Sequence, residues 1–255
     1  MAKQGMKIKI GVMGSASGPT LRNPHAVALA RRLGEEVARR GCILITGACP
    51  GLPDKAAEGA RQCGGFVFGI SPAFSRREHL EIYGSPIEQY DMILYSGMGL
   101  MERDIVNIRS SDAIAIVGGG VGSLNEFTVA YEERKPIGVL TGTGGLSNHI
   151  PEILSFLHRR NDPERLVYDD DPERLIDRLL ALTARVTPPL RESDIGGERE
   201  APTYTQVEKT RRRQRRVRDR VTQREENSGN GRSSRKHVGS RGSKRAPKKA
   251  DVRQR

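Results

Sequence analysis

The sequence predicts an α/β fold: a doubly wound, mostly parallel sheet of about seven strands, with helices on both faces, followed by a disordered basic tail. Short, continuously apolar runs alternate with helical patterns over residues 7–186, as in sheets buried on both faces. Beyond Pro188-Pro189, apolar residues become sparse and Arg, Lys, Ser and Gly predominate. Such a composition cannot bury a core. We therefore expect one folded domain over residues 1–190 and a disordered, Arg/Lys-rich tail over residues 191–255.

The expected elements follow from apolar runs and from the residues that begin and end them. Strands are expected at residues 7–13, 43–46, 66–71, 92–95, 113–117, 137–140 and 166–168. A first helix is expected over residues 24–40, because Asn23 is a good N-cap, Pro24 suits the first helical position and Gly41 follows the end. Further helices are expected after residue 53, around residues 101–110, from Ser123 onwards, and over residues 172–186, the last capped by Asp171.

The positive charge of the chain is concentrated at one end. The 255 residues carry a formal net charge of +12, yet residues 209–255 hold 19 Lys and Arg against four Asp and Glu. Residues 1–208 hold 24 basic and 27 acidic residues and are slightly acidic. The net positive charge therefore comes from the tail and not from the rest of the chain. Residues 209–255 could bind nucleic acid nonspecifically by counterion release, or could serve only as a solubilising extension.

The cysteines and the apolar runs indicate where in the cell the protein is expected. Cys42, Cys49 and Cys63 form no CxxC pair and have no His at metal-ligand spacing, so we expect reduced thiols and no metal site. The N-terminus runs into the first strand without the apolar region of a signal peptide, and no apolar run reaches the roughly 20 residues of a membrane helix. We expect a cytoplasmic protein with no membrane partner and no bound cofactor.

The segment from residue 101 to residue 126 carries the strongest functional signal. An apolar strand runs into a loop with Gly118, Gly119, Gly120 and Gly122, and a helix with Ser123 and Glu126 follows. Glycines that lead into a helix N-terminus bind phosphate, because backbone N–H groups and the helix dipole favour an anion. The preceding helix adds Arg103 and Arg109, which could hold phosphate or sugar. Six residues separate these two arginines, about 120° around an ideal helix, so Arg103 is the better candidate.

Loops after two other strands are expected to share the same cleft. Gly14 and Ser15 follow the first strand, and Gly47 follows the second. Ligands of parallel sheets bind at the carboxyl ends of the strands. Each of these glycines could alternatively be a plain turn residue.

The body resembles the Lonely Guy family, often labelled "lysine decarboxylase-like", within the Rossmann-like SLOG superfamily. That family's Pro-Gly-Gly-x-Gly-Thr-x-x-Glu motif stands here as Gly118-Gly119-Gly120-Val121-Gly122-Ser123-Leu124-Asn125-Glu126. Its upstream Met-His-Glu-Arg-Lys stands as Leu100-Met101-Glu102-Arg103-Asp104, and a second Arg matches Arg109. Gly14, Ser15 and Gly47 fit its other loops. The resemblance covers about residues 7–186, with Pro replaced by Gly and Lys replaced by Asp.

The resemblance implies a nucleoside 5′-monophosphate phosphoribohydrolase, which releases a free base and ribose 5-phosphate, and it implies a homodimer. Glu126 would stabilise the oxocarbenium-like sugar cation and orient water, and Arg103 would fix the substrate. The glycine loop and Ser123 would hold the phosphate. The alternative is a protein of the same superfamily that binds a nucleotide or a phosphorylated cofactor, as a carrier, without cleaving it.

Ser123 and Glu126 also allow an interpretation without function. Ser-x-x-Glu is the pattern of a capping box, in which the Glu side chain only satisfies a backbone N–H at the helix start. A helix that begins at Ser123 would leave this interpretation open.

Overall fold

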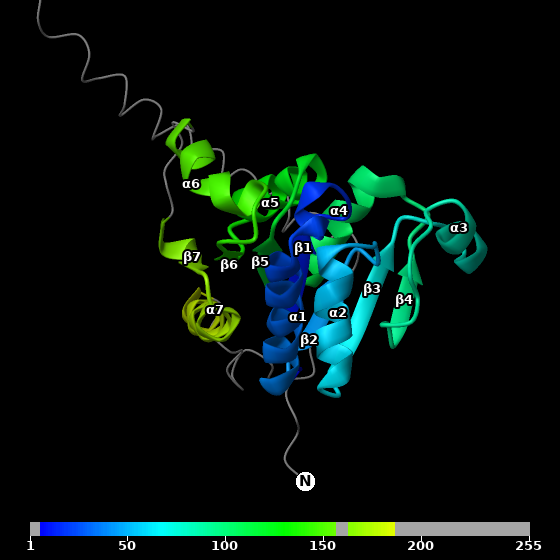
Figure 1. The fold of residues 1–255 in the computed structure, drawn as a ribbon, viewed down its shortest axis with the longest axis horizontal. Coiled ribbons are helices and arrows are strands. Elements are labelled where there is room, and N and C mark those ends of the chain that lie inside the picture. Colours follow the sequence, from blue (N-terminus) through cyan, green and yellow to red (C-terminus); the bar gives the residue numbers. More distant parts are fainter. Residues whose placement is uncertain (1–5, 157–162, 187–255) are drawn as a thin grey trace, which may run out of the picture. The chain divides into compact units, whose positions relative to one another are not determined.

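The computed structural model of the chain describes residues 6–156 and 163–186. These residues form a seven-stranded sheet in which every neighbouring pair of strands is parallel. The strand order is β4-β3-β2-β1-β5-β6-β7, so the sheet is doubly wound about β1 (Figure 1). The predicted α/β class is thereby confirmed. The predictions for the tail, residues 191–255 and its basic part 209–255, lie outside the described residues.

The strands agree closely with the apolar runs. They are β1 (Lys9–Gly14), β2 (Ile43–Thr46), β3 (Phe66–Ser71), β4 (Met92–Tyr95), β5 (Ala113–Val117), β6 (Ile137–Leu140) and β7 (Leu166–Asp169). Five of the seven match the expected residues at both ends, and β1 and β7 differ from them by one or two residues. Continuous apolar runs mark strands that are covered on both faces. Strands β1, β2, β5 and β6 are buried in this way, whereas β4 alternates exposed and half-buried residues.

The helices are α1 (Pro24–Arg39), α2 (Leu52–Gln62), α3 (Arg76–Glu81), α4 (Gly99–Ser110), α5 (Val121–Glu132), α6 (Leu146–Phe156) and α7 (Pro172–Val186). Two 3₁₀ turns, Pro19–Arg22 and Pro163–Arg165, complete the described chain. Asn23 caps α1 by accepting a hydrogen bond from the His25 N–H at 3.0 Å. Asp171 caps α7 in the same way, accepting from the Arg174 N–H at 3.1 Å. Both caps were expected from the sequence.

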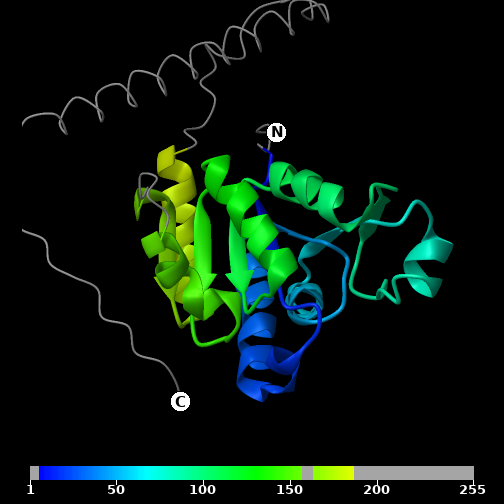
Figure 2. The ribbon, with the colours of Figure 1, turned by 90° about the horizontal axis from the view of Figure 1, so that it is seen from above.

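Two apolar clusters fill the space between the sheet and its helices. One joins α1, α2 and α7 to one face of the sheet, with Leu33, Leu44 and Leu179 fully buried. The other joins α4, α5 and α6 to the opposite face, with Ile108, Ile116 and Phe127 fully buried. In Figure 1, α1, α2 and α7 stand in front of the strands. Helix α3 lies beyond β4, at the edge of the described chain (Figure 2).

Candidate functional site

Three loops at the carboxyl ends of β1, β2 and β5 meet at Ser15. The Ser15 carbonyl accepts a hydrogen bond from the Leu52 N–H at 2.8 Å, and the Ser15 N–H donates to the Val117 carbonyl at 3.3 Å. The Ser15 hydroxyl oxygen accepts from the Gly119 N–H at 2.7 Å. The predicted convergence of the three glycine-bearing loops is therefore confirmed. Ser15 itself is a buried junction between them.

Gly14 lets β1 approach β5 closely. A Cβ at this position would fall 2.1 Å from the Val117 carbonyl oxygen, so only glycine fits without moving the backbone. This contact brings the end of β1 against the start of the β5–α5 loop. The role of Gly14 in this geometry is to position the loop.

The glycine loop after β5 divides into a buried half and an exposed half. The Gly118 N–H donates to the Thr143 hydroxyl at 2.9 Å, and the Gly119 N–H donates to Ser15. The N–H groups of Gly118 and Gly119 therefore hold the loop to its neighbours and are not open to a phosphate. Gly120 to Gly122 are exposed, and a Cβ on Gly120 or Gly122 would meet open space.

Helix α5 begins two residues before Ser123. Gly120 is its N-cap, and no side chain caps it. Within residues 6–156 and 163–186, no acceptor is found for the N–H groups of Gly120, Val121, Gly122 and Ser123. These are the four donors that a helix leaves open at its start. Open donors of this kind, at the positive end of the helix dipole, are able to bind an anion.

The same helix start excludes the capping-box interpretation. Ser123 is the third residue of α5 and Glu126 the sixth, so neither occupies the position that a capping box requires. Both side chains are nevertheless buried, at 4% and 7% exposure. Their burial at the ligand end of the sheet calls for another role.

Arg103 is buried at the end of β2, against Gly47. Its residue is 5% exposed, and its Nε has no hydrogen-bond partner among the described residues. The guanidinium occupies the space that a side chain on Gly47 would need, because a Cβ there would lie 1.9 Å from Arg103 Nη1. The carboxylate of Asp104 forms an ion pair with Nη1 at 3.6 Å, a separation too long for a hydrogen bond. Gly47 and Arg103, far apart in sequence, are thus brought together as predicted.

Two buried carboxyl groups lie beside this arginine. The pKa of Glu126 is raised to about 8, chiefly by burial and next by the charge of Asp104, while Arg103 and a hydrogen bond with Asn107 act in the opposite direction. Burial also raises the pKa of Asp104, whose Oδ2 accepts a hydrogen bond from Asn125 Nδ2 at 3.0 Å. At neutral pH, Glu126 is therefore mainly a neutral acid that can donate a hydrogen bond.

Arg109 is not part of this cluster. Its side chain is 65% exposed and forms an ion pair with Glu133, just past the end of α5, at 2.6 Å. Arg109 lies at the last turn of α4, whereas Arg103 lies near the first, a separation of about 9 Å along the helix. The structure therefore places Arg109 away from the carboxyl ends of the strands, and does not support the binding role that the sequence suggested for it.

Several polar residues of the site were not singled out from the sequence. Asp104 was noted only as a departure from a motif, and Asn107, Asn125 and Thr143 were not noted. The sequence held a signal for two of them in their spacing, because Asp104 and Asn107 lie one and four positions after Arg103 and so share one helix face; the structure buries all three. Buried polar groups on one helix face indicate a functional cluster.

Cys49 lies close to this cluster, and its surroundings keep its thiol protonated. Burial raises the pKa of its thiol to about 11, and the charge of Glu126 acts in the same direction, against the effect of Arg103. A thiol with this pKa carries little thiolate at neutral pH. Cys49 is therefore a neutral wall residue.

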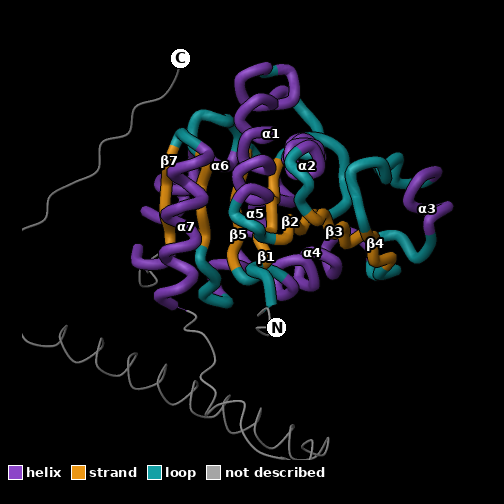
Figure 3. The backbone as a smooth tube through the Cα atoms, turned by 90° about the horizontal axis from the view of Figure 1, so that it is seen from below, coloured by secondary structure: helices purple, strands orange, loops and turns teal. Residues whose placement is uncertain are grey.

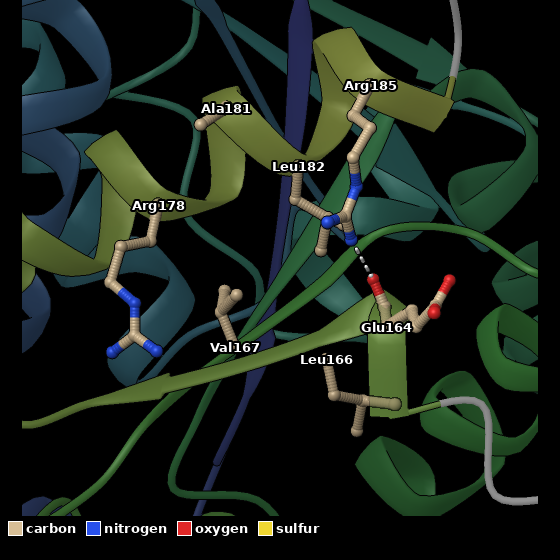
Figure 4. A pocket seen from close by; sticks show the side chains of 7 residues that line it. All are labelled: Glu164, Leu166, Val167, Arg178, Ala181, Leu182 and Arg185. Carbon is tan, nitrogen blue, oxygen red and sulfur yellow. Dashed lines mark hydrogen bonds between the residues drawn. The ribbon is translucent and has the colours of Figure 1, made fainter.

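A separate groove of about 600 Å³ lies between β7 and α7 (Figure 4). Its lining residues are Glu164, Leu166, Val167, Arg178, Ala181, Leu182 and Arg185. Arg185 Nη2 donates to the Glu164 carbonyl across it at 2.8 Å. None of the predicted site residues lines this groove, and both of its walls continue into residues outside the described chain.

Residues 6–156 and 163–186 contain neither a membrane-spanning helix nor a metal-binding cluster. No helix there combines the length and the apolarity needed to cross a membrane. Nor do three or more His, Cys, Asp or Glu side chains come together there as ligands for a metal ion.

Comparison with known proteins gives matches over most of the body. A model of the SLOG cluster4 family matches residues 7–176. A protein of uncharacterised function from Archaeoglobus fulgidus is 32% identical over 133 residues, which are 52% of this chain and 80% of that protein. The structure of the molybdenum cofactor binding protein from Rippkaea orientalis is 26% identical, with a TM-score of 0.56, and the match covers 70% of this chain and 99% of that one. The molybdenum cofactor carrier protein from Chlamydomonas reinhardtii is 27% identical, with the same TM-score and the same coverage.

Proposed function

The chain belongs to the SLOG cluster4 family, and from this membership we propose that it binds a phosphorylated heterocyclic small molecule and releases it intact. The ligand class includes nucleotides and phosphorylated pterins such as the molybdenum cofactor. Two similar solved structures are named as a binding protein and a carrier protein for that cofactor. These names favour the carrier alternative over the Lonely Guy hydrolase interpretation.

The observation that carries the proposal is the buried Arg103 guanidinium. A charged group is seldom buried without a hydrogen-bonded partner, since losing hydration costs several kcal/mol. Arg103 Nε has no partner among the described residues, and Asp104 lies beyond hydrogen-bond distance. An anionic ligand would supply the missing acceptors. The N–H groups at the first turn of α5 also lack hydrogen-bond acceptors among the described residues, and the same anion could accept from them.

The protonation of Glu126 does not suit the role that the hydrolase interpretation gives it, which is to stabilise a sugar cation. Hydrolysis of an N-glycosidic bond needs a negative group beside the developing sugar cation. With a pKa of about 8, Glu126 is mainly protonated at neutral pH. Asp104 stands where the hydrolase motif has Lys, and its carboxylate keeps that pKa high. A neutral Glu126 suits hydrogen bonding to an intact ligand.

The test is titration calorimetry with AMP, isopentenyladenosine monophosphate and the molybdenum cofactor, followed by chromatography of the recovered ligand. We expect at least one of them to bind and to be returned unchanged. Release of free base and ribose 5-phosphate would overturn the proposal in favour of the hydrolase. Failure of all three to bind, at protein concentrations of about 100 μM, would overturn it as well.

Two arginines on one helix provide the matched variants. Arg103→Gln should weaken binding by roughly 100-fold, because the lost group is a charge-assisted donor in a buried site. Arg109→Gln changes an exposed side chain paired with Glu133 and should leave the affinity unchanged. Equal affinity for both variants would place the ligand elsewhere.

A further inference from the structure

The starts of α4 and α5 differ in character from the buried polar cluster that lies one helical turn below them. Both helices pack on the same face of the sheet, and Figure 3 shows α4 on the side of the strands opposite α2. Both helices follow strands of a parallel sheet, so both begin at the carboxyl ends of the strands. Asp104 on α4 and Asn125 on α5 are joined by a hydrogen bond of 3.0 Å. The residues one turn closer to the helix starts therefore lie above this contact, at the opening of the candidate site.

On α4, the residue one turn above the cluster is Leu100. An ideal helix turns by about 100° and rises by about 1.5 Å per residue, which places Leu100 within about 60° of both Arg103 and Asp104 and about 5 Å closer to the helix start. Leu100 thus continues the helix face that buries those two polar side chains. The burial ends at this point, because Leu100 and its neighbour Met101 are each 55% exposed.

Val121 and Gly122 occupy the matching positions on α5. Val121 lies one turn before Asn125, and Gly122 lies one turn before the buried Glu126. Val121 is 86% exposed, and a Cβ on Gly122 would meet open space. Side chains on a helix lean toward its start, so Leu100 and Val121 both extend toward the ligand end. The opening therefore has an apolar wall on each helix and free space above Glu126.

Hydrogen bonds to neighbouring loops hold the two helix starts in place. The N–H of Gly99, the first residue of α4, donates to the Pro72 carbonyl at 3.2 Å. The carbonyl of Gly119, just before α5, accepts from the Leu146 N–H at 2.9 Å. Walls that are fixed before a ligand arrives need less ordering when it binds.

The residues at the two helix starts favour contact with the faces of a flat ring. Residues 99–101 are Gly-Leu-Met and residues 120–123 are Gly-Val-Gly-Ser, with no ionisable residue among them. Leu and Val side chains contact a ring through dispersion and the hydrophobic effect, and the Met101 thioether makes favourable contacts with aromatic rings. None of these three side chains carries a strong donor or acceptor that could recognise the polar edge of a particular base.

We propose that Leu100, Met101 and Val121 hold the ring of the ligand by its faces, while Arg103 and the first turn of α5 hold its anionic end. This inference rests on the proposed function and narrows the ligand class. The site prefers large fused rings and distinguishes little between rings of the same size. The apolar walls are continuous with the polar cluster along the same helix faces, so a single compound with an anionic end and a flat ring contacts both.

Calorimetry of the full chain with four phosphorylated compounds tests this preference. Ribose 5-phosphate carries no base, UMP carries a single ring, and AMP and GMP carry fused rings with different edges. AMP and GMP should bind within about threefold of each other and at least about tenfold more tightly than ribose 5-phosphate, since about 60 Å² of buried apolar surface corresponds to a factor of ten. UMP should lie between them. A difference of roughly 100-fold between AMP and GMP would overturn the proposal.

Variants at the helix starts locate the ring. Leu100→Ser with Val121→Ser should weaken AMP binding by about tenfold and leave the affinity for ribose 5-phosphate unchanged. Both side chains are exposed, so the melting temperature should be preserved. The matched control is Met92→Ser, which changes a 53% exposed residue at the start of β4, the strand end away from the site. Unchanged AMP binding in the double variant, or an equal loss for AMP and ribose 5-phosphate, would contradict the proposal.

The same measurements separate this inference from the proposed function. Failure of all four compounds to bind the unmodified chain would overturn both. Breakdown of AMP, followed by chromatography of the recovered samples, would refute only the release of an intact ligand. An AMP affinity equal to that of ribose 5-phosphate would refute only the contact with the ring.

Discussion

At the scale of single residues, α4 reverses the usual pattern of a surface helix. It buries Arg103, Asp104 and Asn107, and near its start it exposes Leu100 and Met101, each by 55%. Burying an arginine beside a carboxyl group stabilises a protein less than an apolar side chain of the same volume would. The arrangement fits the proposed binding of an anion, because it places a cation at the carboxyl ends of the strands.

The protonation of Glu126 should make stability depend on pH. Its pKa is about 8 in the folded chain, above the 4.5 of an ordinary glutamate. Between these values the folded state keeps a proton that the unfolded state has lost. The free energy of unfolding should therefore fall as pH rises from 5 to 8, by up to about 1.4 kcal/mol per pH unit. Urea unfolding at several pH values measures this slope.

The matched variants separate Glu126 from the rest of the chain. Glu126→Gln should flatten the slope, because glutamine does not titrate, whereas Glu102→Gln changes an exposed residue on α4 and should keep it. An unchanged slope in Glu126→Gln would mean that Glu126 is ionised throughout this range.

A side chain at position 47 should weaken ligand binding only by displacing Arg103. In Gly47→Ala the new methyl would occupy the position of Arg103 Nη1, and the flexible arginine would move while the backbone stays. We expect a small change in melting temperature and a loss of affinity of about tenfold or more. In a chain that already carries Arg103→Gln, Gly47→Ala should cause no further loss of ligand affinity, because both substitutions act on the Arg103 side chain. Additive losses in the calorimetric affinities would refute this coupling.

At the scale of elements, continuous apolar runs made the strands predictable. The helices were less so. Helix α3 has six residues and α6 contains Pro151, so one is too short for a periodic signal and the other carries a residue that usually ends a helix. The start of α5 was misplaced because Ser123 looks like a cap, whereas the chain enters the helix through Gly120.

The candidate site was predictable to the extent that it follows from strand ends. Gly14, Ser15, Gly47 and the glycine loop come together because the strands are parallel and adjacent. The contacts of Asp104 with Arg103 and Asn125 depend instead on how α4 packs against α5. The spacing of residues within one motif does not show how two helices pack against each other.

The first turn of α5 allows stability and binding to be changed in opposite directions. Gly120 is the N-cap, with an ordinary negative φ, and a Cβ added to it would meet open space. Gly120→Asp should stabilise the helix by about 0.5 kcal/mol, since Asp is a good N-cap and its charge favours the helix start. The same carboxylate should repel a phosphate and abolish binding.

Melting curves and calorimetry of this variant check both effects. Gly120→Asn, a cap of the same shape without the charge, should retain more of the affinity. Undiminished binding by Gly120→Asp would show that the ligand does not use this helix start.

At the scale of the whole molecule, the excess of basic residues lies within residues 209–255 of the sequence, which include none of the candidate site residues. We propose that residues 209–255 bind nucleic acid through phosphate contacts, with no sequence preference. The full chain should bind unrelated DNA and RNA sequences alike, with dissociation constants of about 10⁻⁴ to 10⁻⁶ M that rise steeply with salt. Deleting residues 205–255 should abolish this binding in a filter or anisotropy assay. Equal binding by the deleted chain would contradict the proposal, and absence of binding by the full chain would favour a solubilising extension.

The central position of β1 has a consequence for how the chain folds. β1 pairs with β2 and also with β5, where Ile10 lies opposite Ala113. The second pairing joins residues about 100 positions apart, so a large loop must close before the middle of the sheet exists. Until then, β1 exposes an apolar strand edge that can pair with other chains. Because Ser15 and Gly119 meet across this junction, the ligand site can assemble only after the slowest contact has formed, and a chain interrupted before β5 is an aggregation hazard.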